Sequence, residues 1–192
     1  DAVLVTVVAS SGSTPPGAGA RMLITKDGRI AGTIGDGHIA QALVPALSAV
    51  DFRCTVLEDR GDFCQKEPFP QAEAAILINN TRVADFIAIR EDDYIVVMTR
   101  GRKNDTLIQA QALKTPAHYI GVIGSARKTA GVFSVLRSQR FTDRDLSRIT
   151  TPIGLDIGSE TPAEIAVSIT DQRILLLPGM YSRNLSCTCL CG

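Results

Sequence analysis

Short apolar runs that alternate with stretches of helical periodicity constrain the fold of this chain more than any other feature. The runs are continuous, as expected for strands that are covered on both faces of a sheet. They span Arg53–Glu58, Ala74–Ile78, Tyr94–Thr99 and Tyr119–Ile123. Helical candidates lie between and after them, at Ile39–Ala49, Thr106–Leu113, Arg127–Gln139, Asp143–Ile149 and Thr161–Thr170. This order predicts an α/β domain with a mostly parallel sheet.

The last of these helices has the clearest start signal in the chain. Thr161 stands at the N-cap position, Pro162 at the first helical position, and Glu164 three residues after the cap. This is a capping box, in which the Thr hydroxyl and the Glu carboxylate each accept from a backbone N–H of the helix start. We therefore expect the helix to begin here.

The first 35 residues have a different character. Two strand-like stretches, Val3–Ala9 and Arg21–Thr25, flank a loop rich in Gly, Ser and Pro, and the turn Lys26–Arg29 follows. This pattern predicts a small β-rich unit ahead of the α/β domain. We divide the chain into this partial unit (1–35), the α/β domain (36–175), which would lack a first strand of its own, and a tail (176–192).

Charge and hydropathy exclude several classes of protein. The 20 Lys and Arg residues balance 20 Asp and Glu residues, and a net charge of zero provides no basic field for nucleic acid. The longest apolar runs, Ala2–Ala9 and Ile174–Leu177, are well short of the ~20 residues that a membrane helix requires. Cys54 and Cys64 are scattered thiols, which fits a reducing compartment. We expect a cytoplasmic protein with neither a nucleic-acid nor a membrane partner.

One glycine loop matches the G-x-G-x-x-G/A pattern of dinucleotide-binding proteins: Gly35-Asp-Gly-His-Ile-Ala40. It follows a possible strand, residues 29–34, and opens an apolar helix, so backbone N–H groups and a helix N-terminus could meet a pyrophosphate. About 20 residues on, Glu58 and Asp59 could accept a hydrogen bond from a ribose hydroxyl. The alternative is a close strand–helix turn that binds no nucleotide.

A second loop, Gly121–Lys128, also runs from a strand into a helix. Ser125 stands at the cap, and Arg127 and Lys128 lie in the first turn. Cations are unfavourable near the positive end of a helix unless an anion lies there, so a bound phosphate would explain them. Alternatively, both side chains extend into solvent.

Two more loops follow predicted strands. The basic cluster in Thr99–Asp105 is either a solvated turn or a further loop at the carboxyl edge, where open α/β sheets bind ligands. Asp156, in the Gly-rich loop 152–161, could orient a ligand amide or cap its own turn. Together the loops predict an anionic ligand in one crevice. The candidate binding residues are Gly35, Gly37, His38, Asp59, Arg60, Arg100, Gly101, Gly124, Ser125, Arg127, Lys128 and Asp156.

Several of these segments closely resemble the XdhC/CoxI-type family of xanthine dehydrogenase accessory proteins. The matching segments are Tyr119–Lys128, Phe141-Thr142, Pro152–Ser168, Ser11–Pro15, Gly19–Met22 and Asp27–Gly35. The resemblance covers most of residues 3–169, and the run Gly-Leu-Asp-Ile-Gly (154–158) is specific. It implies a Rossmann-like parallel-sheet domain preceded by the small β-rich N-terminal unit.

The resemblance also implies a function. Members of the family are maturation factors that bind molybdenum cofactor, a molybdopterin carrying a phosphate or a nucleotide. They protect it during sulfuration and deliver it to a molybdenum hydroxylase such as xanthine dehydrogenase. The resemblance therefore implies contacts with that enzyme and with a cysteine desulfurase, and self-association into a homo-oligomer.

The chain departs from the family in three places. Thr33–Gly35 runs directly into the Gly37-His38 loop, where the family has a strand and many residues in between. We expect residues to be missing between about Ile34 and Gly37, and with them the family cysteine of this region. Arg102 stands where the family usually has His, which weakens any role of that position in proton transfer.

The third departure is the tail. Cys187, Cys189 and Cys191 alternate, so an extended chain would place the three thiols on one side. Soft-metal binding is conceivable. Zinc sites, however, usually combine four ligands with C-x₂₋₄-C pairs, so the spacing favours no metal site.

The residues leave two functional classes open. The chain holds only two histidines, His38 and His118, and it has neither an H-x-E zinc pattern nor a serine elbow, which favours a binding protein without catalysis. His38 could touch the ligand or simply be a polar residue at a helix start. The alternative is an NAD(P)-binding oxidoreductase or a nucleotide-sensing domain, since Gly35, Gly37 and Asp59 would serve a dinucleotide equally well.

Overall fold

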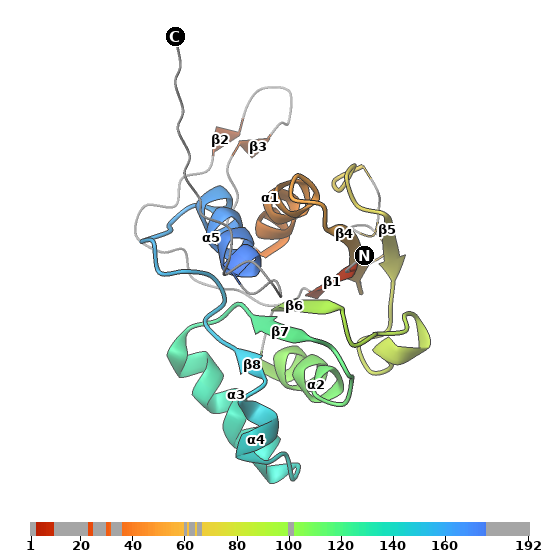
Figure 1. Ribbon diagram of the computed structural model, residues 1–192, viewed down its shortest axis with the longest axis vertical. Coiled ribbons are helices and arrows are strands. Elements are labelled where there is room, and N and C mark those ends of the chain that lie inside the picture. Colours follow the sequence, from red (N-terminus) through yellow and green to blue (C-terminus); the bar gives the residue numbers. More distant parts are fainter. Residues whose placement is uncertain are drawn as a thin grey trace.

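A six-stranded parallel sheet forms the centre of the protein in the computed structural model (Figure 1). The structure describes residues 3–9, 23–24, 30–31, 36–59, 61, 64, 67–99 and 102–175. The strands of the sheet are β1 (Val3–Ala9), β4 (Arg53–Glu58), β5 (Ala74–Leu77), β6 (Tyr94–Thr99), β7 (Tyr119–Val122) and β8 (Ile149–Thr150). The helices are α1 (Asp36–Ser48), α2 (Arg102–Ala112), α3 (Ala126–Ser138), α4 (Asp143–Leu146) and α5 (Pro162–Leu175), with a 3₁₀ turn η2 (Val83–Asp85). The predicted α/β parallel sheet is confirmed.

Strand β1 lies at the middle of this sheet and pairs in parallel with both β4 and β6. The order β5-β4-β1-β6-β7-β8 is the 3-2-1-4-5-6 order of a Rossmann fold when the strands are counted along the chain. The prediction that Val3–Ala9 belongs to a separate β-rich unit, and that the sheet lacks a first strand, is therefore wrong. A continuous apolar run suits a central strand because both of its faces are covered.

Two short strands form a second, antiparallel sheet: β2 (Leu23–Ile24) and β3 (Ile30–Ala31). Of the possible strand at residues 29–34, the described residues Ile30–Ala31 form β3, which pairs with β2 and does not belong to the parallel sheet. Residues 32–35 lie outside the described part of the chain, so the expected gap near Ile34–Gly37 stays a prediction. The divisions of the chain at residues 35 and 175 also stay predictions.

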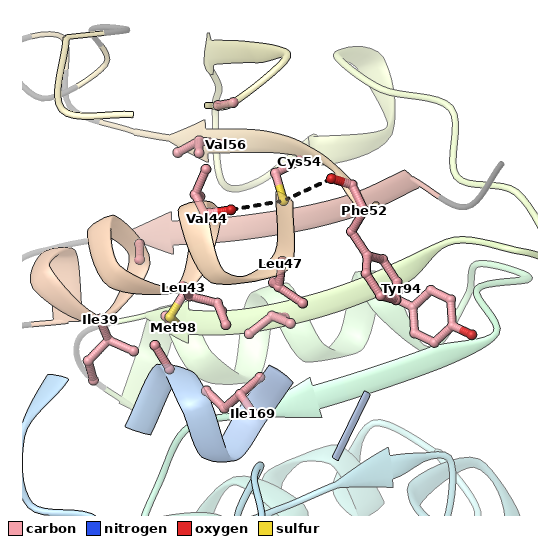
Figure 2. Packing of buried hydrophobic residues seen from close by; sticks show 14 of the residues in the cluster. Ile39, Leu43, Val44, Leu47, Phe52, Cys54, Val56, Tyr94, Met98 and Ile169 are labelled. Atoms are coloured by element: carbon pink, nitrogen blue, oxygen red, sulfur yellow. Dashed lines mark hydrogen bonds between the residues drawn. The ribbon is translucent and has the colours of Figure 1, made fainter. Parts of the chain in front are cut away.

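Helices cover both faces of the sheet. On one face, α1 and α5 pack over the alternate side chains Tyr94, Val96 and Met98 of β6 (Figure 2). On the other face, α2 and α3 pack over Ile95 and Val97. The alternation along β6 shows why the strand reads as one apolar run, since all six of its residues are buried.

The helix starts agree with the sequence to within one residue except at α1, which begins at Asp36 rather than Ile39, and at α2. The capping box of α5 is confirmed, because the Glu164 backbone N–H donates to Thr161 Oγ1 and the Thr161 N–H donates to Glu164 Oε2 (3.2 and 2.9 Å). Helix α2, predicted from Thr106, begins at Arg102. Its first turn buries the polar residues Asp105 and Thr106, so the apolar periodicity appears only one turn later.

Gly121 of β7 and Gly124 of the loop that follows it differ in packing, and this allows a matched test. A Cβ at Gly121 would lie 2.3 Å from Ile153 and 2.6 Å from Tyr119, whereas one at Gly124 would meet nothing closer than 3.8 Å. We expect Gly121→Ala to lower the free energy of unfolding by ~1–3 kcal/mol through overpacking, and Gly124→Ala to change it by less than ~0.5 kcal/mol. Urea denaturation of both variants measures the difference, and equal losses would contradict this assignment.

Candidate functional site

The carboxyl ends of the central strands lie level with one another and form the candidate site. Ala9 of β1 pairs with Thr99 of β6, and Val8 pairs with Glu58 of β4. Helices α2 and α3 begin at this edge because each follows a strand of the parallel sheet, and α1 begins here because it precedes the parallel strand β4. Open α/β sheets bind ligands where the strand order reverses, which here is between β1 and β6.

The structure brings several predicted site residues to this edge. Gly37 and His38 lie in the first turn of α1, Asp59 directly follows β4, and Gly124 follows β7. Ser125, Arg127 and Lys128 lie at the start of α3. Gly35, Arg60, Arg100 and Gly101 lie outside the described residues, as do Cys187, Cys189 and Cys191.

Asp59, predicted to accept a hydrogen bond from a ribose hydroxyl, is itself hydrogen-bonded to a residue that follows the neighbouring strand β5. Asn80, in the turn after β5, donates from Nδ2 to Asp59 Oδ2 over 2.7 Å. The backbone carbonyl of Asn80 accepts in turn from Gln111 Nε2 of α2 over 2.6 Å. The carboxylate therefore has a fixed orientation at the edge of β4, as a group that recognises a ligand hydroxyl requires.

Lys128 takes part in a buried polar cluster. Its Nζ lies 2.7 Å from Asp105 Oδ2 and donates to the Thr99 carbonyl over 3.3 Å. Asp105 is only 1% exposed and also accepts from the Thr99 hydroxyl. The cation at the start of α3 is thus explained by an internal carboxylate, which neither the phosphate nor the solvent alternative anticipated.

Arg127 is the cation at this helix start that remains available. Its side chain is exposed, and within the described part of the chain it pairs with no acidic group. Ser125 is the predicted N-cap, since its hydroxyl accepts from the Lys128 backbone N–H over 3.3 Å. A Cβ at Gly124 would make only ordinary van der Waals contacts. Packing within the protein therefore does not require glycine at this position.

The loop after β8 is anchored to its neighbours, while Asp156 itself is exposed. Thr129 and Thr151 share a hydrogen bond of 3.1 Å, which ties this loop to α3. Gln172 of α5 accepts from the Gly154 N–H and donates to the Gly154 carbonyl. The anchoring explains how the loop is held, and it leaves the ligand role of Asp156 as a prediction.

The two described cysteines are free thiols. Cys54 is buried under α1, and burial raises its thiol pKa to about 12 (Figure 2). Cys64, in the loop after β4, has a pKa raised by partial burial and by the nearby charge of Glu58. Both are thiols at neutral pH, which makes them poor nucleophiles. Among the described residues, no three His, Cys, Asp or Glu side chains gather where they could hold a metal ion.

Sequence reasoning missed three residues of this edge: Thr99, Asn80 and Asp105. Asp105 carried no signal for its role, because its partner Lys128 lies on another helix. Nothing in the sequence relates Asn80 to Asp59, which lies 21 positions earlier.

Strand order and parallel pairing place the protein in the class of Rossmann domains. Family comparison then agrees with this class. Residues 33–172 match the XdhC Rossmann domain, and residues 1–50 match the XdhC and CoxI family. The chain belongs to the XdhC family.

Individual relatives support the same assignment. The chain is 30% identical over 123 residues to a Bacillus subtilis protein named as a probable subunit of xanthine dehydrogenase, covering 64% of this chain and 35% of that protein. It is 26% identical over 137 residues to the uncharacterized protein YqeB of Escherichia coli, covering 71% and 25%.

A solved structure is also similar. A crystal structure described as a xanthine dehydrogenase from Bacillus halodurans superimposes with a TM-score of 0.67 at 25% identity, over 95% of this chain and 44% of that one. The chain therefore spans between a quarter and less than half of the length of these relatives. None of the helices in the described residues is long and apolar enough to cross a membrane.

Two adjacent cations at the start of α3 should differ sharply in their effect on stability. Lys128→Met leaves the buried Asp105 carboxylate without its ammonium, so we expect the free energy of unfolding to fall by ~2 kcal/mol. This loss is smaller than the ~3–5 kcal/mol expected when one partner of a fully buried ion pair is removed, because the Lys128 side chain is 34% exposed. Arg127→Met should change it by less than ~0.5 kcal/mol.

Chemical denaturation of both variants checks this. Combining Lys128→Met with Asp105→Asn should cost less than the sum of the single changes, since the two groups interact directly. Additive losses would mean that the pair does not form.

Proposed function

We propose that the protein is an accessory factor that binds molybdenum cofactor and hands it to a molybdenum hydroxylase of the xanthine dehydrogenase type. The observation that carries the proposal is the start of α3. There Arg127, exposed and without an acidic partner among the described residues, follows Gly124 at the carboxyl edge of the sheet. A helix N-terminus with a guanidinium beside it is suited to a phosphate.

The chemistry of this edge fits a phosphorylated pterin. Backbone N–H groups at the starts of α1 and α3 can donate to phosphate oxygens, and Arg127 can add a charge-assisted hydrogen bond. The open space at Gly124 would let a ligand approach the backbone closely. Lys128 would contribute indirectly, because its ammonium pairs with Asp105 and thereby fixes the start of α3.

The partners follow from this role. A factor that carries cofactor would contact the acceptor enzyme, and a cysteine desulfurase if the cofactor is sulfurated while bound. Cytoplasmic location and self-association belong to the same proposal. It requires binding and positioning from this chain and assigns it no catalytic step.

A second candidate function rests on Asp59. An oriented carboxylate at the end of the second strand of a Rossmann sheet suits the ribose hydroxyls of a nucleotide such as NAD(P). An oxidoreductase or a nucleotide sensor would use this residue. A cofactor that carries a nucleotide beside its pterin would use it as well.

Removal of the exposed cation tests the phosphate contact. Arg127→Ala should weaken binding of molybdenum cofactor about tenfold at low salt, as expected for the loss of a charged hydrogen bond. The deficit should shrink as salt is added, because exposed charges are screened. Arg137→Ala, at the other end of the same helix, is the matched control and should leave the affinity unchanged. Fluorescence titration provides the affinities, and an unchanged affinity at low salt would overturn the phosphate contact.

Replacing Asp59 separates the two candidate functions. Asp59→Ala should weaken NADH or another ribose-bearing ligand about tenfold and leave a pterin monophosphate nearly unaffected. Equal losses for both ligands would show that Asp59 only supports the loop. Tight NADH binding accompanied by turnover of a small substrate would replace the accessory role with an oxidoreductase.

A further inference from the structure

A cavity lies away from the carboxyl edge, between α2 and the connection from β5 to β6. It has a volume of about 330 Å³, within the range of small-molecule pockets. Ile95 and Ile108 contribute from β6 and α2, and Ala84, Ile87 and Ala88 contribute from the connection. Among the described residues that line the cavity, Lys114 carries the only charge.

The cavity exists because this part of the sheet has a thin cover. In a doubly wound fold a helix usually follows each strand, but residues 78–93, all of which the structure describes, contain only the 3₁₀ turn η2 (Figure 1). Val83, Ile87 and Ile89 of this connection pack against the core as separate side chains rather than as one helical face. The space that a helix would fill stays open.

The wall of the cavity is held in place by Gln111 of α2. Its Oε1 accepts from the Val83 backbone N–H over 2.9 Å, and its Nε2 donates to the Asn80 carbonyl over 2.6 Å. A third bond joins Nε2 to the Leu107 carbonyl. Since the connection is fixed to α2 at both of these points, the cavity is preorganised rather than collapsed.

The positive charge of Lys114 in the cavity lining favours an apolar ligand that carries an anionic group. Lys114 follows α2 and is exposed, and within the described chain no acidic group pairs with it. A lysine stem can line an apolar surface while its ammonium stays at the rim. The cavity thus offers an aliphatic interior with one cation at its rim.

We propose that this cavity binds a medium-chain aliphatic carboxylate, with the chain among the isoleucine side chains and the carboxylate beside Lys114. A water molecule takes up ~30 Å³ in the liquid. If each non-hydrogen group of a ligand needs a similar volume, the cavity holds roughly ten such groups. An acid of about eight carbons, with its carboxylate at the rim, fits that space. The proposal is independent of the cofactor edge.

A chain-length series tests the fit in the full chain. Calorimetric titration with hexanoate, octanoate, decanoate and dodecanoate should show affinity rising about fourfold for each added CH₂. The rise should stop near ten non-hydrogen atoms, where the cavity is full. Affinity that keeps rising with length would indicate detergent-like adsorption and overturn the proposal, as would the absence of any binding.

Two variants locate the ligand. Ala88→Trp fills the cavity from an exposed position and should abolish octanoate binding, whereas Ala163→Trp, at an exposed position of α5, should not. Lys114→Met keeps the stem and removes the charge, so it should weaken octanoate several-fold and leave neutral octanol unchanged. Lys103→Met, at the other end of α2, is the matched control.

Other results would reject the proposal. Equal losses from Lys114→Met and Lys103→Met would mean that only net charge attracts the acid. Loss of association with a partner enzyme in Ala88→Trp, without octanoate binding to the unchanged protein, would assign the cavity to a protein side chain instead. Cofactor binding should be unchanged in Ala88→Trp and Lys114→Met, so this proposal and the proposed function can fail separately.

Discussion

The parallel pairing of β1 with both β4 and β6 is the contact on which the rest of the structure depends. It joins Val3–Ala9, at the start of the chain, to strands that lie some 50 and 90 residues further on. Without β1 the sheet would divide into a β4–β5 pair and a β6–β8 group, each with an exposed edge. The central strand also creates the strand reversal, so the position of the candidate site follows from this one pairing.

Periodicity predicted most elements of the fold but not their neighbours. Strands β4 and β6 were predicted with their observed bounds, since each is a continuous buried run. The run at Val3–Ala9 carried the same signal, yet the Gly- and Pro-rich segment that follows it suggested a separate unit. An apolar run shows that a strand is covered on both faces, and it contains nothing that identifies its partners in the sheet.

The candidate site was predictable in position and less so in detail. Strands that are followed by helices place their loops on one edge, and this put His38, Asp59 and Ser125 together in advance. The separate roles of Arg127 and Lys128 could not be predicted, because both occupy the first turn of the same helix. Only the packing of α2 against α3 shows that Lys128 reaches a buried carboxylate while its neighbour does not.

Helix α2 connects the carboxyl edge of the sheet and the apolar cavity, and buried or partly buried polar contacts fix both of its ends. At its start, Asp105 accepts from Thr99 and pairs with Lys128. Near its end, Gln111 holds the connection between β5 and β6. A buried polar group is costly unless it is satisfied, so each contact favours one placement of the helix over its alternatives. The fold itself therefore sets the start of α3, through Asp105 and Lys128, and the wall of the cavity, through Gln111.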